Sequence, residues 1–209
     1  MKRITVIIIV LSLFGYACSK KVNFENVHAN VPAFNQKISV ATWDQREQIV
    51  SGSRKPDFVG YMRSGAGIAY PMGTTSGKPL ANLISNNVSS SLSAQGSTAS
   101  VIATNANQSE LTILSNLKKS GKNRLILINC KQLHMDGTGG RYLLYNLIVN
   151  VYTGNGTVIK QKAFTGKKPL GGSWFFGPGK YKQYMPEALK NLIGEVFNDA
   201  DIVSALKAK

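Results

Sequence analysis

Three short stretches of the sequence hold residue types that do chemistry in proteins, and the first is the glycine-rich turn GTTSGKPL. It has the glycines and the lysine of a phosphate-binding loop at Gly73, Gly77 and Lys78. Such a loop needs four residues between its glycines and a Ser or Thr after its lysine. Here three residues separate the glycines, and Pro79 follows the lysine. A turn leading into a proline-started helix explains this stretch better than nucleotide binding.

The other two stretches are a Cys–His pair and an acidic pair. Cys130 and His134 lie four residues apart on a predicted strand and could share a face. A structural zinc site needs four ligands, so we expect burial of these two side chains instead. Asp199 and Asp201 are the only close pair of acids, and their place at a predicted helix end favours capping over acid/base catalysis. The sequence therefore predicts no catalytic residue, no metal site and no cofactor.

A basic and aromatic segment supplies the candidate for partner binding. Residues 137–186 contain no acid but seven basic residues, namely Arg141, Lys160, Lys162, Lys167, Lys168, Lys180 and Lys182. Within them, GGSWFFGPGKYK places Trp174, Phe175 and Phe176 among glycines and a proline. We expect a contact with a membrane surface or a partner to be formed by Lys167, Lys168, Trp174, Phe175, Phe176, Lys180 and Lys182. The alternative is that the aromatic side chains cap the core while the lysines only face water.

The first 17 residues have the order of a bacterial secretion signal. Lys2 and Arg3 form a positive region, residues 4–14 are apolar, and Gly15 to Ala17 form a short region of mostly small residues. The apolar run of 11 residues is shorter than the ~20 that a membrane-spanning helix needs. We expect residues 1–17 to be cleaved as a signal peptide.

Cys18 follows this signal directly, which resembles the lipobox of bacterial lipoproteins. Cleavage before Cys18 would leave its sulfur to carry a diacylglyceryl group, and acyl chains contribute about 0.8 kcal/mol per buried CH₂ to membrane anchoring. Cys130 would then have no partner, and we expect it to be a small buried apolar residue. The alternative is an ordinary signal with an incidental cysteine, which would make the chain a secreted effector.

The excess of basic residues limits the classes of partner that the mature chain is expected to bind. Without Lys2 and Arg3, 23 basic residues stand against 10 acidic ones. Such an excess favours anionic partners, and for an exported bacterial protein these are lipid head groups, cell-wall polymers or acidic proteins. The export signal argues against nucleic acid.

The pattern of elements predicts one domain behind a tether. Residues 18–36 are polar and without a sustained period, so we expect a lipidated N-terminus and tether. Residues 37–209 are expected to form a single α+β domain. Its predicted strands are 38–46, a hairpin within 58–77, 99–104, 124–135, 141–152 and 158–164; its predicted helices are 79–96, 107–121 and about 186–201, followed by a short turn at 202–207. This order predicts a mixed or antiparallel sheet with helices packed mainly on one face.

The same features resemble a known family. VATWDQR opens the domain, PLANLISNNVSSSLSAQG forms a helix before a strand, and EALKNLIGEVFNDADIVSAL closes the chain after a long meander. Together with the lipobox, this combination resembles the YajG-type bacterial envelope lipoproteins and, more distantly, auxiliary lipoproteins of ABC transport systems. The resemblance rests on Asp44, Arg46, Gly96 and Asp199. It implies a non-enzymatic envelope protein and supplies no catalytic residue.

Two classes of function follow from the sequence. The favoured one is a lipid-anchored envelope lipoprotein that faces the periplasm and acts as a binding, assembly or transport-accessory module. The alternative is an envelope hydrolase whose carboxylates are distant in the sequence. Ser19 is not the aspartate that is associated with inner-membrane retention, so we expect the outer membrane. The expected partners are the membrane, through the anchor, and an anionic envelope polymer or envelope protein complex.

Overall fold

The computed structural model describes residues 20–63, 67–136, 141–170 and 181–208 of the 209-residue chain. The predicted signal peptide and Cys18 lie outside these residues. The described strands are β1 Lys20–Val22, β2 Lys37–Asp44, β3 Phe58–Arg63, β4 Ala69–Thr74, β5 Thr98–Val101, β6 Arg124–Asp136, β7 Tyr142–Thr153 and β8 Val158–Pro169. The described helices are α2 Glu47–Val50, α3 Leu80–Ala94, α4 Glu110–Lys119, α5 Tyr181–Asn198 and α6 Ala200–Lys207.

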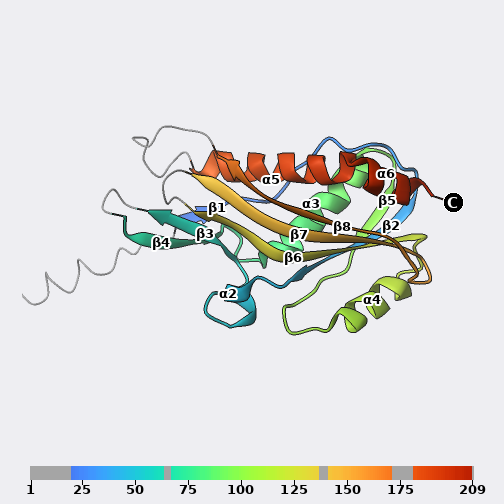
Figure 1. Cartoon of the computed structure of the whole chain (residues 1–209), viewed down its shortest axis with the longest axis horizontal. Coiled ribbons are helices and arrows are strands. Elements are labelled where there is room, and N and C mark those ends of the chain that lie inside the picture. The colour runs from blue at the N-terminus through green and yellow to red at the C-terminus, as the bar shows by residue number, and fades with distance from the viewer. Residues whose placement is uncertain (1–19, 64–66, 137–140, 171–180, 209) are drawn as a thin grey trace, which may run out of the picture.

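One mixed sheet of eight strands organises the molecule around β6 (Figure 1). The first half of β6 pairs in parallel with β2, and Met135 near its end pairs in parallel with Gly60 of β3. On its other side β6 pairs antiparallel with β7, which pairs antiparallel with β8. The turn between β7 and β8 contains Asn155 and Gly156, a pair typical of hairpin turns, and Gly156 has a φ of +93°, a conformation that favours glycine. Within the described residues, β8 pairs only with β7 and so forms an outer edge.

Helices lie on both faces of the sheet, but mainly on one. Figure 1 shows α3, α5 and α6 on one side and α4 on the other. The large core lies between the sheet and α3, α5 and α6, where it includes Leu92 and Phe197. A smaller core of Ile113 and Leu117 packs α4 against one end of the opposite face. The predicted α+β class with helices mainly on one face is confirmed.

The N-terminal segment differs from the predicted tether. Residues 20–22 form β1 beside β4, and the residues after them run across α3. Phe24, Val31 and Phe34 are buried in the large core. The side chain of Asn87 in α3 accepts a hydrogen bond from the Val27 N–H and donates one to the Phe24 carbonyl. Residues 20–36 are thus part of the domain. The segment is extended, and its apolar side chains pack into the core against helices as well as strands.

Helix boundaries show smaller corrections. α3 begins after Pro79 and is followed by Gly96, whose φ of +87° suits a residue just beyond a helix end. α5 begins at Tyr181 rather than at Pro186, so Pro186 lies inside the helix, where it removes one backbone hydrogen bond. The predicted turn at 202–207 is instead part of α6. None of the described helices combines the length and the apolarity that crossing a membrane would require.

Candidate functional site

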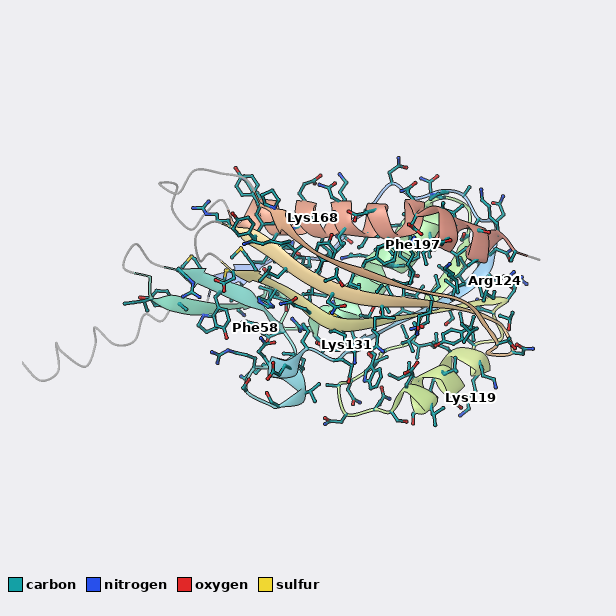
Figure 2. The ribbon with its side chains drawn as sticks, viewed as in Figure 1. Phe58, Lys119, Arg124, Lys131, Lys168 and Phe197 are labelled. Carbon is teal, nitrogen blue, oxygen red and sulfur yellow. The ribbon has the colours of Figure 1, made fainter. Side chains whose placement is uncertain are left out.

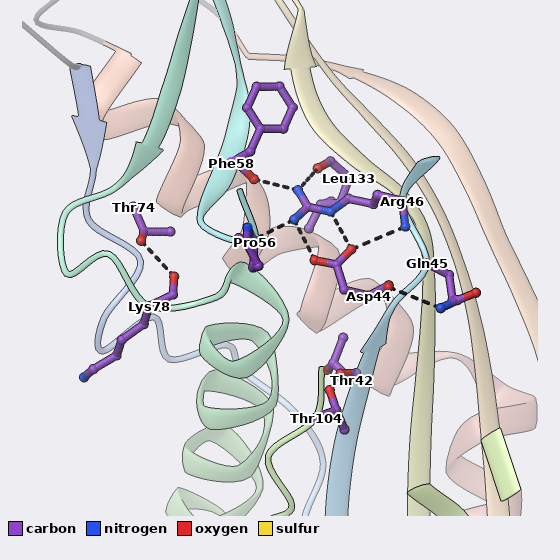
Figure 3. Close-up of polar contacts among 10 residues, drawn as sticks. All are labelled: Thr42, Asp44, Gln45, Arg46, Pro56, Phe58, Thr74, Lys78, Thr104 and Leu133. Carbon is purple, nitrogen blue, oxygen red and sulfur yellow. Dashed lines mark hydrogen bonds and ion pairs between the residues drawn. The ribbon is translucent and has the colours of Figure 1, made fainter. Parts of the chain in front are cut away.

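The Asp44–Arg46 pair of the VATWDQR stretch lies in the interior (Figure 3). Asp44 is the last residue of β2, and Arg46 lies between β2 and α2, which begins at Glu47. Arg46 Nε donates to Asp44 Oδ1 over 2.8 Å, and its Nη2 donates to Oδ2 over 2.7 Å. Arg46 is 1 % exposed. This is a bidentate, charge-assisted ion pair away from water.

Every N–H of the Arg46 guanidinium is used within the chain. Besides the two bonds to Asp44, Nη1 donates to the carbonyls of Phe58 and Leu133, and Nη2 donates to that of Pro56. A guanidinium has five N–H donors, so none is left for a ligand. Burial alone would lower the pKa of Arg46, but the hydrogen bonds to Asp44 and nearby charges raise it. Arg46 is therefore a permanent charge that joins β2, β3 and β6, and its part is structural.

The sheet face opposite α5 is covered by fewer helices than the face that packs on α3, α5 and α6. Alternation along β7 buries Leu143, Leu147 and Val149 beneath the helices, while the residues between them face the other way. α4 covers only one end of that face. We call the remainder the open face; it includes Trp43 of β2, Asn129, Lys131 and His134 of β6, Tyr142, Asn146 and Ile148 of β7, and Gln161, Thr165 and Lys167 of β8. It is a mixed surface of amides, aromatic rings and two lysines.

Polar atoms without partners mark the centre of the open face. Among the residues that the structure describes, Trp43 Nε1, Asn129 Oδ1 and His134 Nδ1 are buried and accept or donate no hydrogen bond. Trp43 and Asn129 are register partners across β2 and β6, so their side chains leave the sheet side by side on the same face. Burial lowers the pKa of His134, which keeps its ring neutral at pH 7. Buried polar groups are usually paired, so this cluster has capacity for water or for a ligand's polar groups.

The sequence held a signal for part of this face. Asn146 and Asn150 alternate with apolar residues in β7, which places amides opposite the core-facing side chains. Trp43 and Asn129 become neighbours only through the parallel pairing of β2 with β6, and the sequence does not show that pairing.

A β-bulge separates the two predicted metal-ligand candidates. The register of β6 with β7 shifts between Cys130 and Gln132, so Leu133 rather than His134 follows Cys130 on the core face. Cys130 and His134 therefore lie on opposite faces, which corrects the predicted shared face. No group of three or more candidate metal-binding side chains occurs within the described ranges. Lys131, within the bulge, is exposed (Figure 2), and because the other face of β6 is core, it belongs to the open face.

Cys130 is buried with a free thiol, as predicted. Burial raises its pKa to about 12, so the thiol stays protonated and inert.

Alternation along β8 sorts the predicted basic residues into two groups. Lys160, Lys162 and Lys168 project to the helix side, where acids of α5 and α6 neutralise them. Lys168 pairs with Glu195 and lies beside α5 in Figure 2. Lys167 projects to the open face, with its Nζ 3.8 Å from the centre of the Tyr142 ring. The acids come from a later part of the chain, so a charge count over 137–186 alone overstates the positive potential here.

Asp199 and Asp201 meet Lys162 at the start of α6. Lys162 Nζ lies 2.7 Å from Asp199 Oδ2 and 2.8 Å from Asp201 Oδ2. Asp199 also caps α6 by accepting hydrogen bonds from the N–H groups of Asp201 and Ile202, which confirms the predicted capping. Hydrogen bonds from Lys162 hold the pKa of both carboxyls below their usual values and raise that of the lysine. The pair is bound to a lysine at the surface.

The remaining predicted contact residues cannot be placed. Trp174, Phe175, Phe176 and Lys180 lie outside the described residues, as does Cys18. Lys182 falls in the first turn of α5, and its side chain is likewise outside the description.

The interior beneath α5 holds a cavity too small for a ligand. Its apolar lining includes Ile128, Leu147, Leu189 and Phe197, and its volume is ≈ 10 Å³. That is about the space that one water molecule needs, and ligand pockets are typically about 300 to 1,000 Å³.

Comparison with known proteins returned solved structures but no sequence family. No protein-family model and no curated protein matches the chain. Protein XCC0632 from Xanthomonas campestris, of family model DUF330, is 12% identical with a TM-score of 0.48, over 90% of this chain and 92% of that one. The PelC dodecamer from Paraburkholderia phytofirmans is 14% identical with a TM-score of 0.41, over 87% and 94%. Lipoprotein GNA1162 from Neisseria meningitidis is 10% identical with a TM-score of 0.31, over 78% and 99%. Bacterial lipoproteins are thus among the solved structures that this chain resembles.

Proposed function

We propose that this chain is a lipid-anchored lipoprotein of a bacterial cell envelope, held by acyl chains on Cys18 and acting as a non-enzymatic binding or assembly module. The observation that carries the proposal is the position of Cys18 directly after a complete secretion signal. Cleavage before Cys18 would leave β1, Lys20–Val22, on the mature chain.

Replacement of Cys18 tests the anchor. The Cys18→Ser variant should lose metabolic palmitate labelling and should leave the membrane fraction in high salt, whereas a Cys130→Ala control should keep both. High salt matters because the basic chain can also bind anionic membranes through charge alone. Wild-type membrane association of Cys18→Ser in high salt would show that Cys18 is not the anchor.

The finer assignment belongs to the same proposal. We place the protein on the outer membrane facing the periplasm, since Ser19 follows the cysteine, and among YajG-type lipoproteins. Density-gradient separation of inner and outer membranes tests the location; recovery with the inner membrane would contradict it.

The arrangement of the acids supports a module over a hydrolase. Most acidic side chains are bound to a lysine or an arginine, including Glu25, Asp44, Asp136 and Glu195. Asp199 and Asp201 share a lysine at the surface and cap a helix. An acid/base pair would need two carboxyl groups that face a substrate in a common pocket.

We propose the open face as the contact surface, with an anionic envelope polymer as its partner. Lys131 and Lys167 supply exposed positive charge there, while the lysines of β8 on the helix side are neutralised by acids. Asn146 and Thr165, which are register partners across β7 and β8, supply polar side chains on the same face. The aromatic ring of Tyr142 adds apolar contact area beside Lys167.

Charge removal tests this surface in the soluble Cys18→Ser background. Lys131→Gln with Lys167→Gln should weaken binding to immobilised lipopolysaccharide or cell-wall polymer, and added salt should have the same effect on the parent. The control is Lys78→Gln with Lys190→Gln, which removes the same charge outside the open face. Equal binding of both double variants at low salt would exclude the open face.

A further inference from the structure

The pairing of β1 with β4 fixes where the lipid anchor would join the domain. The two strands run parallel, with Lys20 opposite Met72 and Val22 opposite Thr74. The part of β4 before Met72 therefore lies at the end of the molecule toward which the first residue of β1, Lys20, is directed. That end carries the β3–β4 hairpin, as Figure 1 shows.

The chain between anchor and domain is short. Only Ser19 lies between Cys18 and Lys20, and an extended chain covers at most about 3.6 Å per residue, so the two Cα atoms lie within about 7 Å. The chain from Val22 to Ala29 is also fixed to the domain, because Val22 and Phe24 are buried and the N–H groups of Val27 and Ala29 donate hydrogen bonds to side chains of α3. Acyl chains on Cys18 would thus hold this end of the domain close to the bilayer.

The hairpin exposes apolar side chains at this end. Ile68 is 57% exposed and Tyr70 is 45% exposed, and their neighbours Gly67, Ala69 and Pro71 are exposed as well. Tyrosine is enriched at membrane interfaces because its ring is apolar and its hydroxyl can stay in water. Isoleucine has no such polar group, and its exposure to water is unfavourable unless another surface covers it.

The charges at this end also suit an anionic bilayer. Lys21 is exposed beside β4, and Lys20 precedes it in the sequence. Asp136, the acid nearest the hairpin in the register of β6, is bound to Arg63 over 3.0 Å. Basic residues next to a membrane anchor contribute about 1 kcal/mol each toward binding anionic lipids.

We infer that the β3–β4 hairpin rests on the bilayer that holds Cys18, with Ile68 and Tyr70 in the head-group layer. The inference rests on the proposed lipid anchor and adds to it a defined orientation: the long axis of β6 and β7 points away from the membrane. The open face is then presented sideways, accessible from the periplasm, and the β7–β8 turn lies at the far end. Contact through one hairpin also restrains rotation of the domain about its anchor.

Val158 provides a matched control for the test. It is 58% exposed, close to the value for Ile68, and it follows the β7–β8 turn. Along β6, the hairpin is at the Met135 end, whereas Val158 pairs with Tyr152 near the Arg124 end. Ile68 and Val158 therefore have nearly the same exposed fraction but lie at opposite ends of the sheet.

The experiment uses full-length acylated protein with Cys130→Ala, so that an introduced cysteine is the only free thiol. Ile68→Cys, Tyr70→Cys and Val158→Cys are each labelled with an environment-sensitive nitrobenzoxadiazole dye and reconstituted into phosphatidylethanolamine–phosphatidylglycerol vesicles. We expect a blue shift at positions 68 and 70 and loss of their emission when the lipids carry a doxyl quencher. Position 158 should show the emission of a water-exposed dye and no quenching.

The anchor and the orientation fail in different ways. If the acylated protein stays on the vesicles while dyes at 68 and 70 behave like the dye at 158, the hairpin contact is wrong and the anchor stands. If Cys18→Ser protein floats with vesicles in high salt as well as the parent does, the proposed anchor is wrong. Quenching at 158 equal to that at 68 would mean a domain lying flat, which also overturns the inferred orientation.

Discussion

Arg46 shows how one side chain can hold three strands together. Its guanidinium pairs with Asp44 and donates to carbonyls that the irregular start of β3 and the bulged part of β6 present. Those carbonyls would otherwise lose hydrogen bonds on burial, at a cost of about 1 to 3 kcal/mol each. The arginine therefore compensates for irregular backbone at the place where β2, β3 and β6 meet.

Removal of this arginine should strongly destabilise the fold. Arg46→Met leaves Asp44 buried without its partner, and breaking a buried pair typically costs about 3–5 kcal/mol of the free energy of unfolding. Arg46→Met with Asp44→Asn should cost less than the sum of the single changes, because no unpaired charge remains. Urea unfolding measures both values. A loss below about 1 kcal/mol for Arg46→Met would contradict the structural part assigned to it.

Cys130 should be protected from thiol reagents until the chain unfolds. Its side chain is buried, and its pKa of about 12 leaves almost no thiolate at pH 8. In the Cys18→Ser background, Ellman's reagent should react with one thiol only after denaturant is added. Rapid reaction of the native protein would show that the site opens without unfolding.

At the scale of elements, the α6 start and β8 form one electrostatic unit. Lys162 of β8 links the cap of α6 to the sheet through two carboxylates. A flexible lysine and two exposed acids form such a unit only because the helix end fixes Asp199.

This unit gives stability a defined dependence on acid. The pKa of Asp199 and Asp201 is lowered in the fold, chiefly by hydrogen bonds from Lys162. Their contribution is therefore present above the unfolded pKa, about 3.9, and lost as the pH falls through the folded pKa. Lys162→Met should make the loss of stability below about pH 4 shallower, as measured by urea midpoints across pH. Lys190→Met, which removes an exposed i,i+3 pair, is the control and should follow wild type.

Local signals accounted for most of the elements. Pro79 and Gly96 bounded α3, alternation defined β7, and Asn155–Gly156 marked the hairpin into β8. The helix predicted over 107–121 begins later, at Glu110 with Ser109 as its cap, which shows the limit of spacing alone. The open face, the Arg46 bonds and the pairs of Lys162 and Lys168 join residues far apart in sequence, and periodicity carries no information about such pairing.

At the scale of the molecule, the N-terminal segment unites parts of the chain that would otherwise be separate. It contributes β1 to the sheet beside β4 and then crosses α3, and Asn198 of α5 donates to the carbonyl of Asn30. The sequence predicted a tether because this segment is polar and without a sustained period, but its buried side chains lie against both α3 and the sheet, so they follow no single period.

Truncation tests this directly. A chain that begins at residue 37, at the predicted domain boundary, should expose the core beneath Phe24, Val31 and Phe34 and should aggregate or unfold at a lower temperature. A chain that begins at Ser19 should remain monodisperse and unfold in one transition. Calorimetry and light scattering compare the two chains. Equal stability would show that residues 19–36 are a tether that the domain does not need.

The outer position of β8 has a consequence for the solution behaviour of the protein. A 12-residue edge strand offers unpaired backbone groups along its length, and a second copy of the chain can add to such an edge. Lys160, Lys162 and Lys168 are paired with acids of the same chain, so the exposed Lys167 is the charge on this strand that a second copy would meet. Lys167→Gln should therefore promote self-association, as measured by light scattering, while the domain itself remains folded.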